Sequence, residues 1–181
     1  MINSQARLLD RLCDGMKPGQ LEWIGLRSEH RGQIDVVEQA DAIAGFGLAG
    51  DHRSRKTPGS GRQVTLISRE FIQQVCLHTG HRHIDPVLLR RNLMISGMNM
   101  NLLRYQRLQI GEVILEPAAL CHPCSRMNQA LGPGGAAAMY GYGGLCARIV
   151  QGGTLSVGDA VVRLAPEPKP EGQRQNSLPG L

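Results

Sequence analysis

Short runs in which apolar and polar residues alternate make up most of this chain. Alternation with a period of two, rich in β-branched residues, is typical of β-strands, and clusters of glycine, proline and polar residues separate one run from the next. We expect strands at residues 23–27, 33–38, 62–67, 92–96, 106–110, 112–116, 145–150 and 158–164. Many short strands without a regular strand–helix alternation predict a mainly β fold, a closed or nearly closed β-barrel.

Helical periodicity is confined to a few segments. Residues 4–15 place apolar side chains on one face, with Gly15 available to end the helix. Ser68 is a suitable N-cap for a helix over 69–78, and Asp85-Pro86 predicts a brief helix through Leu89. Between these segments, residues 45–51 carry three glycines and predict a turn, and 53–61 predict a polar loop at the rim.

The composition fits one domain with two flanking segments. A chain of 181 residues with 41% hydrophobic content is long enough for one well-buried core. We expect an N-terminal helix and lead-in at 1–18, the barrel domain at 19–165, and a disordered tail at 166–181, where proline, glutamate, lysine, glutamine and serine predominate.

Composition also limits the location and the partners of the protein. The sequence has no run of eighteen apolar residues, and its first residues lack the charged-then-apolar order of a secretory signal, so we expect no membrane span. Five cysteines, an odd number in a chain of this size, favour a reduced compartment and hence the cytoplasm. Aromatic residues amount to 3%, too few for the stacking platforms of nucleic-acid binding.

The net charge of +5 gathers in the folded body, at residues 51–56, at Arg62, at 81–83 and at 90–91. Such clusters could attract phosphate or carboxylate, but a solvated basic surface is the more frequent explanation.

The most reactive stretch is 116–132, which contains Cys121 and Cys124. Pro123 suits the first turn of a helix, so we expect Cys124 in that turn, where the helix dipole and Arg126 would favour the thiolate. A buried cysteine that acts only as a small hydrophobe is the competing interpretation. Cys-His-Pro-Cys could also serve a thiol–disulfide exchanger, although no long helix follows, and one cysteine pair falls short of the four ligands of a structural zinc site.

Six segments, in this order, resemble the MOSC domain, the module at the C-terminus of molybdenum-cofactor sulfurases that also occurs as stand-alone bacterial proteins. The segments are Gly47-Leu-Ala-Gly-Asp51, Arg62-Gln-Val-Thr-Leu-Ile-Ser68, Arg90-Arg-Asn-Leu-Met-Ile-Ser-Gly97, Ile110-Gly-Glu-Val-Ile-Leu-Glu116, Pro123-Cys-Ser-Arg-Met127 and 143–159. The resemblance implies a mixed β-barrel and runs from about Trp23 to Leu164.

The resemblance also implies a function for Cys124, on which the characteristic cysteine of the family falls. Members are thought to carry sulfur as a cysteine persulfide, or to bind a molybdenum–pterin cofactor and reduce N-hydroxylated compounds with it. A thiolate is both a sulfur nucleophile and a soft metal ligand, so the sequence leaves the two roles open. A sulfur-relay module without turnover is a further alternative. The desulfurase domain of the full sulfurases is missing, so we expect no pyridoxal phosphate and a separate sulfur donor or redox partner.

Candidate contacts to an anionic cofactor are Arg62, Arg126 and the pair Arg91–Asn92, which resembles an arginine–asparagine pair of the family. A guanidinium can clamp a phosphate with two parallel hydrogen bonds. The alternative is that Arg91 and Asn92 tie a helix end to a strand. Cys121 is either a bystander or a resolving thiol that would discharge a persulfide as a disulfide.

Overall fold

The computed structural model describes residues 4–56 and 58–165. The predicted tail at 166–181 lies outside the described residues, as do the first three positions of the predicted N-terminal segment.

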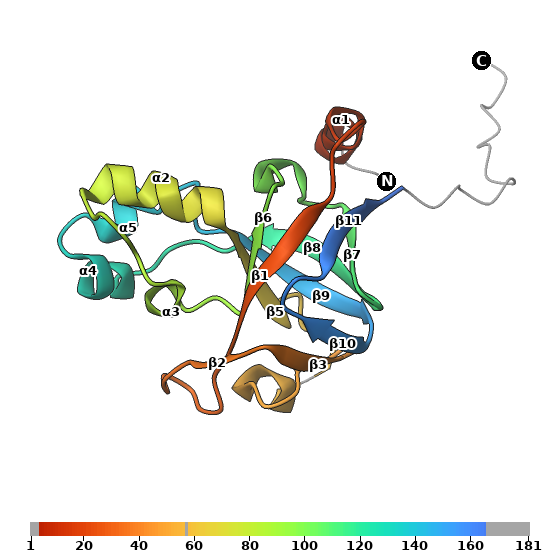
Figure 1. Ribbon diagram of the computed structural model, residues 1–181, viewed down its shortest axis with the longest axis horizontal. Helices are drawn as coiled ribbons and strands as arrows, with labels where there is room; N and C mark the ends of the chain where they lie inside the picture. Colours follow the sequence, from red (N-terminus) through yellow and green to blue (C-terminus); the bar gives the residue numbers. More distant parts are fainter. Residues whose placement is uncertain (1–3, 57, 166–181) are drawn as a thin grey trace, which may run out of the picture.

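Seven of the described strands close into a barrel (Figure 1). Around the barrel the order is β11-β7-β8-β9-β5-β6-β1, and β1 pairs with β11 to complete the ring. Only the pairing of β5 with β6 is parallel among these neighbours, so the barrel is mixed, as predicted. The bounds are β1 (Gly19–Leu26), β5 (Val64–Ser68), β6 (Leu93–Ser96), β7 (Arg107–Ile110), β8 (Val113–Leu120), β9 (Leu145–Gln151) and β11 (Ala160–Leu164).

A small second sheet lies beside the barrel, and the chain that enters it differs from one predicted strand. The segment expected as one strand at 33–38 forms β2 (Asp35–Val37), which pairs with β1, and the chain then enters β3 (Gln39–Ile43). β3 pairs with β4 (Gly47–Leu48) and with β10 (Gly153–Ser156) in a separate three-stranded sheet. The break falls at Glu38, whose carbonyl accepts a hydrogen bond from the Val157 amide at 2.9 Å.

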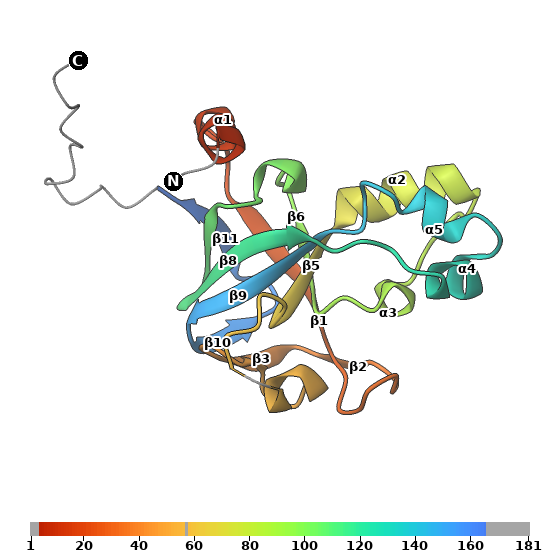
Figure 2. The ribbon, with the colours of Figure 1, turned by 180° about the vertical axis from the view of Figure 1, so that it is seen from behind.

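The helices divide into two groups (Figures 1 and 2). α2 (Arg69–Thr79), α3 (Pro86–Leu89), α4 (Arg126–Leu131) and α5 (Gly135–Ala138) gather at one end of the barrel, and α1 (Ser4–Leu12) lies apart from them, near β11. Arg163 of β11 bonds to Asp10 and so fastens α1 to the barrel. Two 3-10 helices, η1 (His52–Arg55) and η2 (Met100–Leu102), complete the described elements. None of the described helices is long and apolar enough to cross a membrane.

The predicted capping residues set the helix ends. The Ser68 hydroxyl accepts from the Phe71 amide at 3.0 Å and starts α2, which ends at Gly80 with a φ of 75°. The Asp85 carboxylate accepts from the Val87 amide at 2.9 Å, and Pro86 opens α3. Arg90 then adopts a φ of 58°, a turn that directs the next two residues into the barrel.

The core follows the period-two pattern of the strands. Leu93 and Ile95 of β6 follow this pattern. In β1 the register shifts between Leu21 and Trp23, so Leu21 and Ile24 both fill the interior although they are three positions apart. β5 differs because all five of its residues are buried. Complete burial of one such aliphatic side chain stabilises the folded state by about 1.5–3 kcal/mol. The packed interior therefore gives rigid support to the residues at the end of the barrel.

The segment around the two neighbouring cysteines departs from the expected helix. β8 continues to Leu120 and delivers the chain directly to Cys121, as predicted. However, α4 begins at Arg126, so Cys124 precedes the helix instead of lying in its first turn, and Pro123 is not a helix-opening residue. The Cys124 carbonyl instead accepts a hydrogen bond from the Met127 amide at 2.9 Å in the turn before α4.

Candidate functional site

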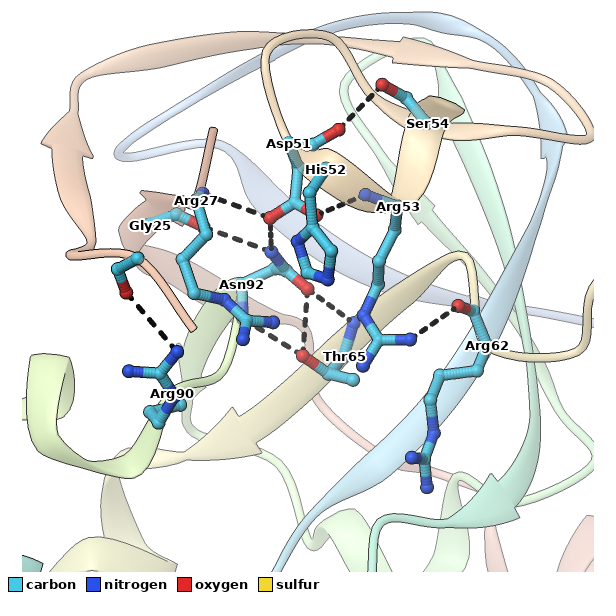
Figure 3. Close-up of polar contacts among 11 residues, drawn as sticks. Gly25, Arg27, Asp51, His52, Arg53, Ser54, Arg62, Thr65, Arg90 and Asn92 are labelled. Atoms are coloured by element: carbon cyan, nitrogen blue, oxygen red, sulfur yellow. Dashed lines mark hydrogen bonds and ion pairs between the residues drawn. The ribbon is translucent and has the colours of Figure 1, made fainter. Parts of the chain in front are cut away.

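A buried polar brace joins three elements at the end of β5. The Asp51 carboxylate accepts from the Arg27 amide at 3.1 Å, from the Arg53 amide at 2.9 Å and from the Asn92 side-chain amide at 2.9 Å (Figure 3). The Asn92 oxygen in turn accepts from the Thr65 hydroxyl at 2.9 Å. Asp51 and Asn92 are each 1% exposed, so the brace fixes the strand ends in a setting of low dielectric.

Local sequence explains why Asp51 occupies this place. Gly47 and Gly50 have φ values of 154° and 82°, which only glycine adopts readily, and they turn the chain sharply before Asp51. Asp51 then caps η1 through its bond to the Arg53 amide. The loop predicted from 53 onward therefore starts as an ordered 3-10 turn, and its first residues are held against the brace.

The brace positions a set of arginines that we call the arginine cluster: Arg27, Arg53, Arg62, Arg90 and Arg91. Figure 3 shows the guanidinium groups of Arg27, Arg53 and Arg62 extending to the same side of the brace. Arg27 is 7% exposed, yet its Nε has no hydrogen-bond partner, and the buried Nε of Arg53 has none either among the described residues. Buried donors are nearly always paired, so these two are available to an acceptor from outside the chain.

The charges of the cluster are only partly compensated. Burial lowers the pKa of the Arg27 guanidinium; Asp51 opposes this shift, and Arg90, Arg53 and Arg91 add to it. Burial likewise lowers the pKa of Arg53, and the charge of Arg62 lowers it further. Asp51 raises the pKa of both Arg27 and Arg53, but its carboxylate already accepts several hydrogen bonds. The cluster therefore keeps a net positive charge in a partly buried place, the setting in which an anion is bound most strongly.

Two buried cysteines border this cluster. Cys121 and Cys146 are 6% and 1% exposed, and the Cys146 sulfur accepts a hydrogen bond from Nε of Arg62 at 3.1 Å. The pKa of Cys121 is lowered to about 6 by a hydrogen bond from Cys146 and by the charges of Arg91, Arg62 and Arg53, against the effect of burial. The same hydrogen bond, with burial, raises the pKa of Cys146. The titrations of the two thiols are therefore linked, and Cys146 holds its proton more tightly than Cys121 does.

Arg91 holds the end of β8 in place. Its guanidinium donates to the carbonyls of Gly143 at 2.7 Å, of Leu89 at 2.8 Å and of Cys121 at 3.3 Å. A side chain added at Gly143 would lie 2.1 Å from the Cys121 carbonyl, so the backbones approach too closely for any other residue. The glycine at this position therefore serves the close packing of two chain segments.

An open groove of about 560 Å³ lies beside the cluster. Arg31, Arg90 and Arg126 supply positive charge to it, and Val87 and Met127 supply apolar surface. Arg126 and Met127 belong to the first turn of α4, two and three positions after the exposed Cys124. Two residues separate Cys124 from Cys121, so the Cα atoms of the two cysteines lie within about 11 Å of each other.

The sequence and the fold both match one family. The sequence model of the MOSC domain matches residues 53–162. The chain belongs to the MOSC domain family. A search of curated proteins gave no match.

Solved structures agree with this MOSC fold. The YuaD protein from Bacillus subtilis superposes with a TM-score of 0.70 at 18% identity, over 80% of this chain and 94% of that one. YiiM from Geobacillus stearothermophilus has a TM-score of 0.66 at 16% identity, over 81% and 75%. YiiM from Escherichia coli has a TM-score of 0.63 at 15% identity, over 81% and 70%. At these identities the likeness concerns the fold.

The MOSC barrel brings some of the predicted site residues together and separates others. Arg62 and Arg91 both act on Cys121, whereas Arg126 lies in the open groove. Asn92 directs its side chain to Gly25, Thr65 and Asp51, which matches the alternative that it ties a helix end to a strand. Cys124 is exposed, and no contact to Arg126 accompanies it in the described part of the chain.

The two competing chemistries that the cysteine pair raised find no support in this MOSC domain. Cys121 is buried and interacts with Cys146, Cys124 is exposed, and a helix of six residues follows them, unlike the long helix of a disulfide exchanger. The described residues include no group of three or more histidine, cysteine, aspartate or glutamate side chains able to hold a metal ion. A metal bound through Cys124 would therefore need to arrive with ligands of its own.

Sequence reasoning missed Arg27, Arg53 and Cys146 as members of the site. Arg53 belongs to the basic run at 51–56. That run indicated positive charge but did not show which way the Arg53 side chain would point. Arg27 comes at the end of a strand and Cys146 lies inside one, and no local pattern distinguishes them from ordinary strand residues.

Proposed function

We propose that this MOSC domain binds a molybdenum–pterin cofactor, with the arginine cluster holding its phosphate and Cys124 supplying a thiolate to its metal. The observation that carries the proposal is the pair of buried, unpartnered Nε atoms of Arg27 and Arg53, in a cluster with a surplus of positive charge. Guanidinium groups bind phosphate through parallel, charge-assisted hydrogen bonds. The donor set therefore fits an anionic cofactor.

Each part of the site has a separate task. Arg27 and Arg53 bind and orient the anion, because the Asp51–Asn92–Thr65 brace fixes their backbones. Arg62, which is more exposed, completes the clamp from the adjoining strand end. Cys124 lies outside the barrel wall, where its soft sulfur can reach a bound metal. When bound, the cofactor supplies two-electron redox chemistry, and we propose reduction of N-hydroxylated compounds as the reaction.

The open groove lined by Arg126 and Met127 is the candidate place for the substrate. Its apolar residues Val87 and Met127 suit the body of an organic molecule, and Arg31, Arg90 and Arg126 suit an anionic or polar end. The electrons would come from a separate redox partner, since the described residues offer no second redox centre beyond their thiols.

A persulfide carrier is the second candidate function, favoured by the exposure of Cys124. An exposed cysteine side chain in the loop before α4 is accessible to a separate sulfur-donor protein. In this case Cys124 would carry one sulfur atom per chain without turnover.

The test uses protein purified from a host that makes the cofactor. We expect molybdenum and pterin in the wild-type protein, and N-hydroxylated base reduction when a reducing partner is supplied. Cys124→Ser should lose bound molybdenum and the activity, whereas Cys76→Ser, in helix α2, should retain both. Labile sulfur on Cys124 without molybdenum would support the carrier instead. Loss of neither in a folded Cys124→Ser protein would overturn both functions.

A further inference from the structure

Cys121 and Cys146 lie on one face of two adjacent strands. In the antiparallel pairing of β8 and β9, Ala119 is opposite Cys146 and Leu120 is opposite Leu145. The Cys121 amide continues this ladder with a hydrogen bond to the Gly144 carbonyl at 2.8 Å. Because side chains alternate between the two faces of a strand, Cys121 shares the face of Ala119 and hence that of Cys146. The two cysteines are therefore diagonal cross-strand neighbours on this face. Cys146 is also the group with the largest effect on the pKa of Cys121.

The surroundings of this pair favour an anionic, nucleophilic sulfur. Cys146 donates its hydrogen bond to Cys121, and Arg91, Arg62 and Arg53 place positive charge around it, which together lower the pKa of Cys121. A thiolate held among guanidinium groups is the form of cysteine that reacts with oxidants.

We propose that Cys121 is a second reactive thiol of this protein, oxidised by hydrogen peroxide and resolved by Cys146 to an intramolecular disulfide. The proposal goes beyond the function assigned to Cys124 and does not depend on it. Cys121 is 6% exposed, so a small oxidant can reach its sulfur, whereas a bulky one such as a glutathione disulfide is hindered.

The reaction needs only the peroxide and the two thiols. The Cys121 thiolate attacks one peroxide oxygen and breaks the O–O bond, which gives a sulfenic acid and releases hydroxide. The Cys146 sulfur then attacks the Cys121 sulfur, the S–S bond forms, and the second hydroxide leaves and combines with the thiol proton as water. The first hydroxide takes up the proton that the Cys121 thiol gave to the solvent when it ionised, so two thiols lose two electrons to one peroxide and two water molecules result.

The other cysteines provide internal controls. Cys13 is buried against the Leu102 carbonyl, and burial together with Asp14 raises its pKa. Cys76 lies in α2, partly buried against the core. Neither has a second cysteine beside it, so neither can form the same disulfide.

The experiment uses the full chain with Cys124→Ser, which removes the exposed thiol. The protein is exposed to hydrogen peroxide at one to ten equivalents, denatured, alkylated, and analysed by peptide mass. We expect a disulfide that joins Cys121 to Cys146, with Cys13 and Cys76 alkylated as free thiols. A Cys121–Cys146 pair that stays reduced until Cys13 and Cys76 are also oxidised would overturn the proposal.

A second variant identifies which sulfur is attacked. In Cys124→Ser with Cys146→Ala, the sulfenic acid cannot be resolved, so a sulfenic-acid trap such as dimedone should label Cys121 at least ten times more than Cys76. Equal labelling of Cys121 and Cys76 in the folded protein would exclude Cys121 as the attacking thiol. If the double variant does not fold, the disulfide measurement decides the proposal alone.

Discussion

The two thiols of the Cys-His-Pro-Cys segment lie three residues apart, yet their surroundings are opposite. Cys124 is exposed in the loop before α4, and it is accessible to a metal, a donor or a substrate from outside. Cys121 is buried at the end of β8, and its properties come from Cys146 and from three arginines. Solvent exposure thus determines what Cys124 can react with, and neighbouring residues determine the properties of Cys121.

This difference shows how a short motif can carry two kinds of chemistry. The reactivity of an exposed cysteine depends on the partner that binds it, whereas the reactivity of a buried cysteine is set by the residues around it. The arginine cluster serves both thiols, because Arg53 and Arg62 lie near Cys121 and also belong to the proposed anion clamp. Substitutions in the buried and the exposed region should therefore have different effects on stability and on anion binding.

The largest effect is expected at the brace that supports the buried region. Asp51→Ala would leave the buried Arg27 guanidinium without its counter-charge, at a cost of about 3–5 kcal/mol in the free energy of unfolding. Asp41→Ala is the control, because its exposed carboxylate bonds only to the Thr154 hydroxyl and should cost less than about 0.5 kcal/mol. Urea denaturation of the two variants measures both values, and similar costs would contradict the role of the brace.

The next effect concerns anion binding by the cluster. Arg53→Gln removes one charge and an unpartnered buried donor, so the dissociation constant for inorganic phosphate should rise about tenfold. Arg148→Gln, which breaks an exposed pair with Glu116, should leave it unchanged. Calorimetric titration at fixed ionic strength measures both. Equal affinity in wild-type protein and Arg53→Gln would show that the cluster is not an anion site.

A pH-dependent effect should mark the buried thiol. The pKa of Cys121 is lowered to about 6 in the folded protein from an ordinary value of 9.0, so its stabilising contribution is complete above the unfolded value and is lost as the pH falls through about 6. The difference in unfolding free energy between the wild-type protein and Cys121→Ser should therefore grow between pH 6 and pH 8.5, by on the order of 1 kcal/mol or more. A difference that is constant with pH would contradict the thiolate.

The smallest effect is expected in the exposed groove. Arg126 lies in open solvent contact beside Arg31 and Arg90, where salt screens its charge. Arg126→Gln should weaken phosphate binding less than about threefold at 0.15 M salt, and more at low salt. A loss as large as that of Arg53→Gln would place the anion in the groove and not at the brace.

The barrel and its helix caps were predictable because their signals are local. Alternation predicted the strands, and Ser68 and Asp85 predicted the starts of α2 and α3. The helix around Pro123 was mispredicted because β8 runs on to Leu120 and five more residues, 121–125, precede the start of α4. The break at Glu38 was also hidden, since it depends on pairing with strands more than a hundred residues away.

The site was predictable only where a local sequence motif or a cluster of charged residues marked it. Cys124 and the basic residues were visible as a motif and as charge. The contact of Cys121 with Cys146, and the convergence of Arg27, Arg53 and Arg62, arise from the closure of the barrel and leave no local signature. Asn92 was ambiguous in sequence because a buried amide can bind a ligand or the backbone, and only its hydrogen bonds to Thr65 and Asp51 separate the two.

The most direct measurement is the molybdenum and labile sulfur bound per chain in the wild-type protein, Cys124→Ser and Cys121→Ser, each purified in parallel from a host that makes the cofactor. The division between the exposed and the buried thiol predicts that Cys124→Ser loses the bound species and that Cys121→Ser, although less stable, retains most of it. Equal loss from both substitutions in folded protein would contradict this division and favour a site made by the two cysteines together.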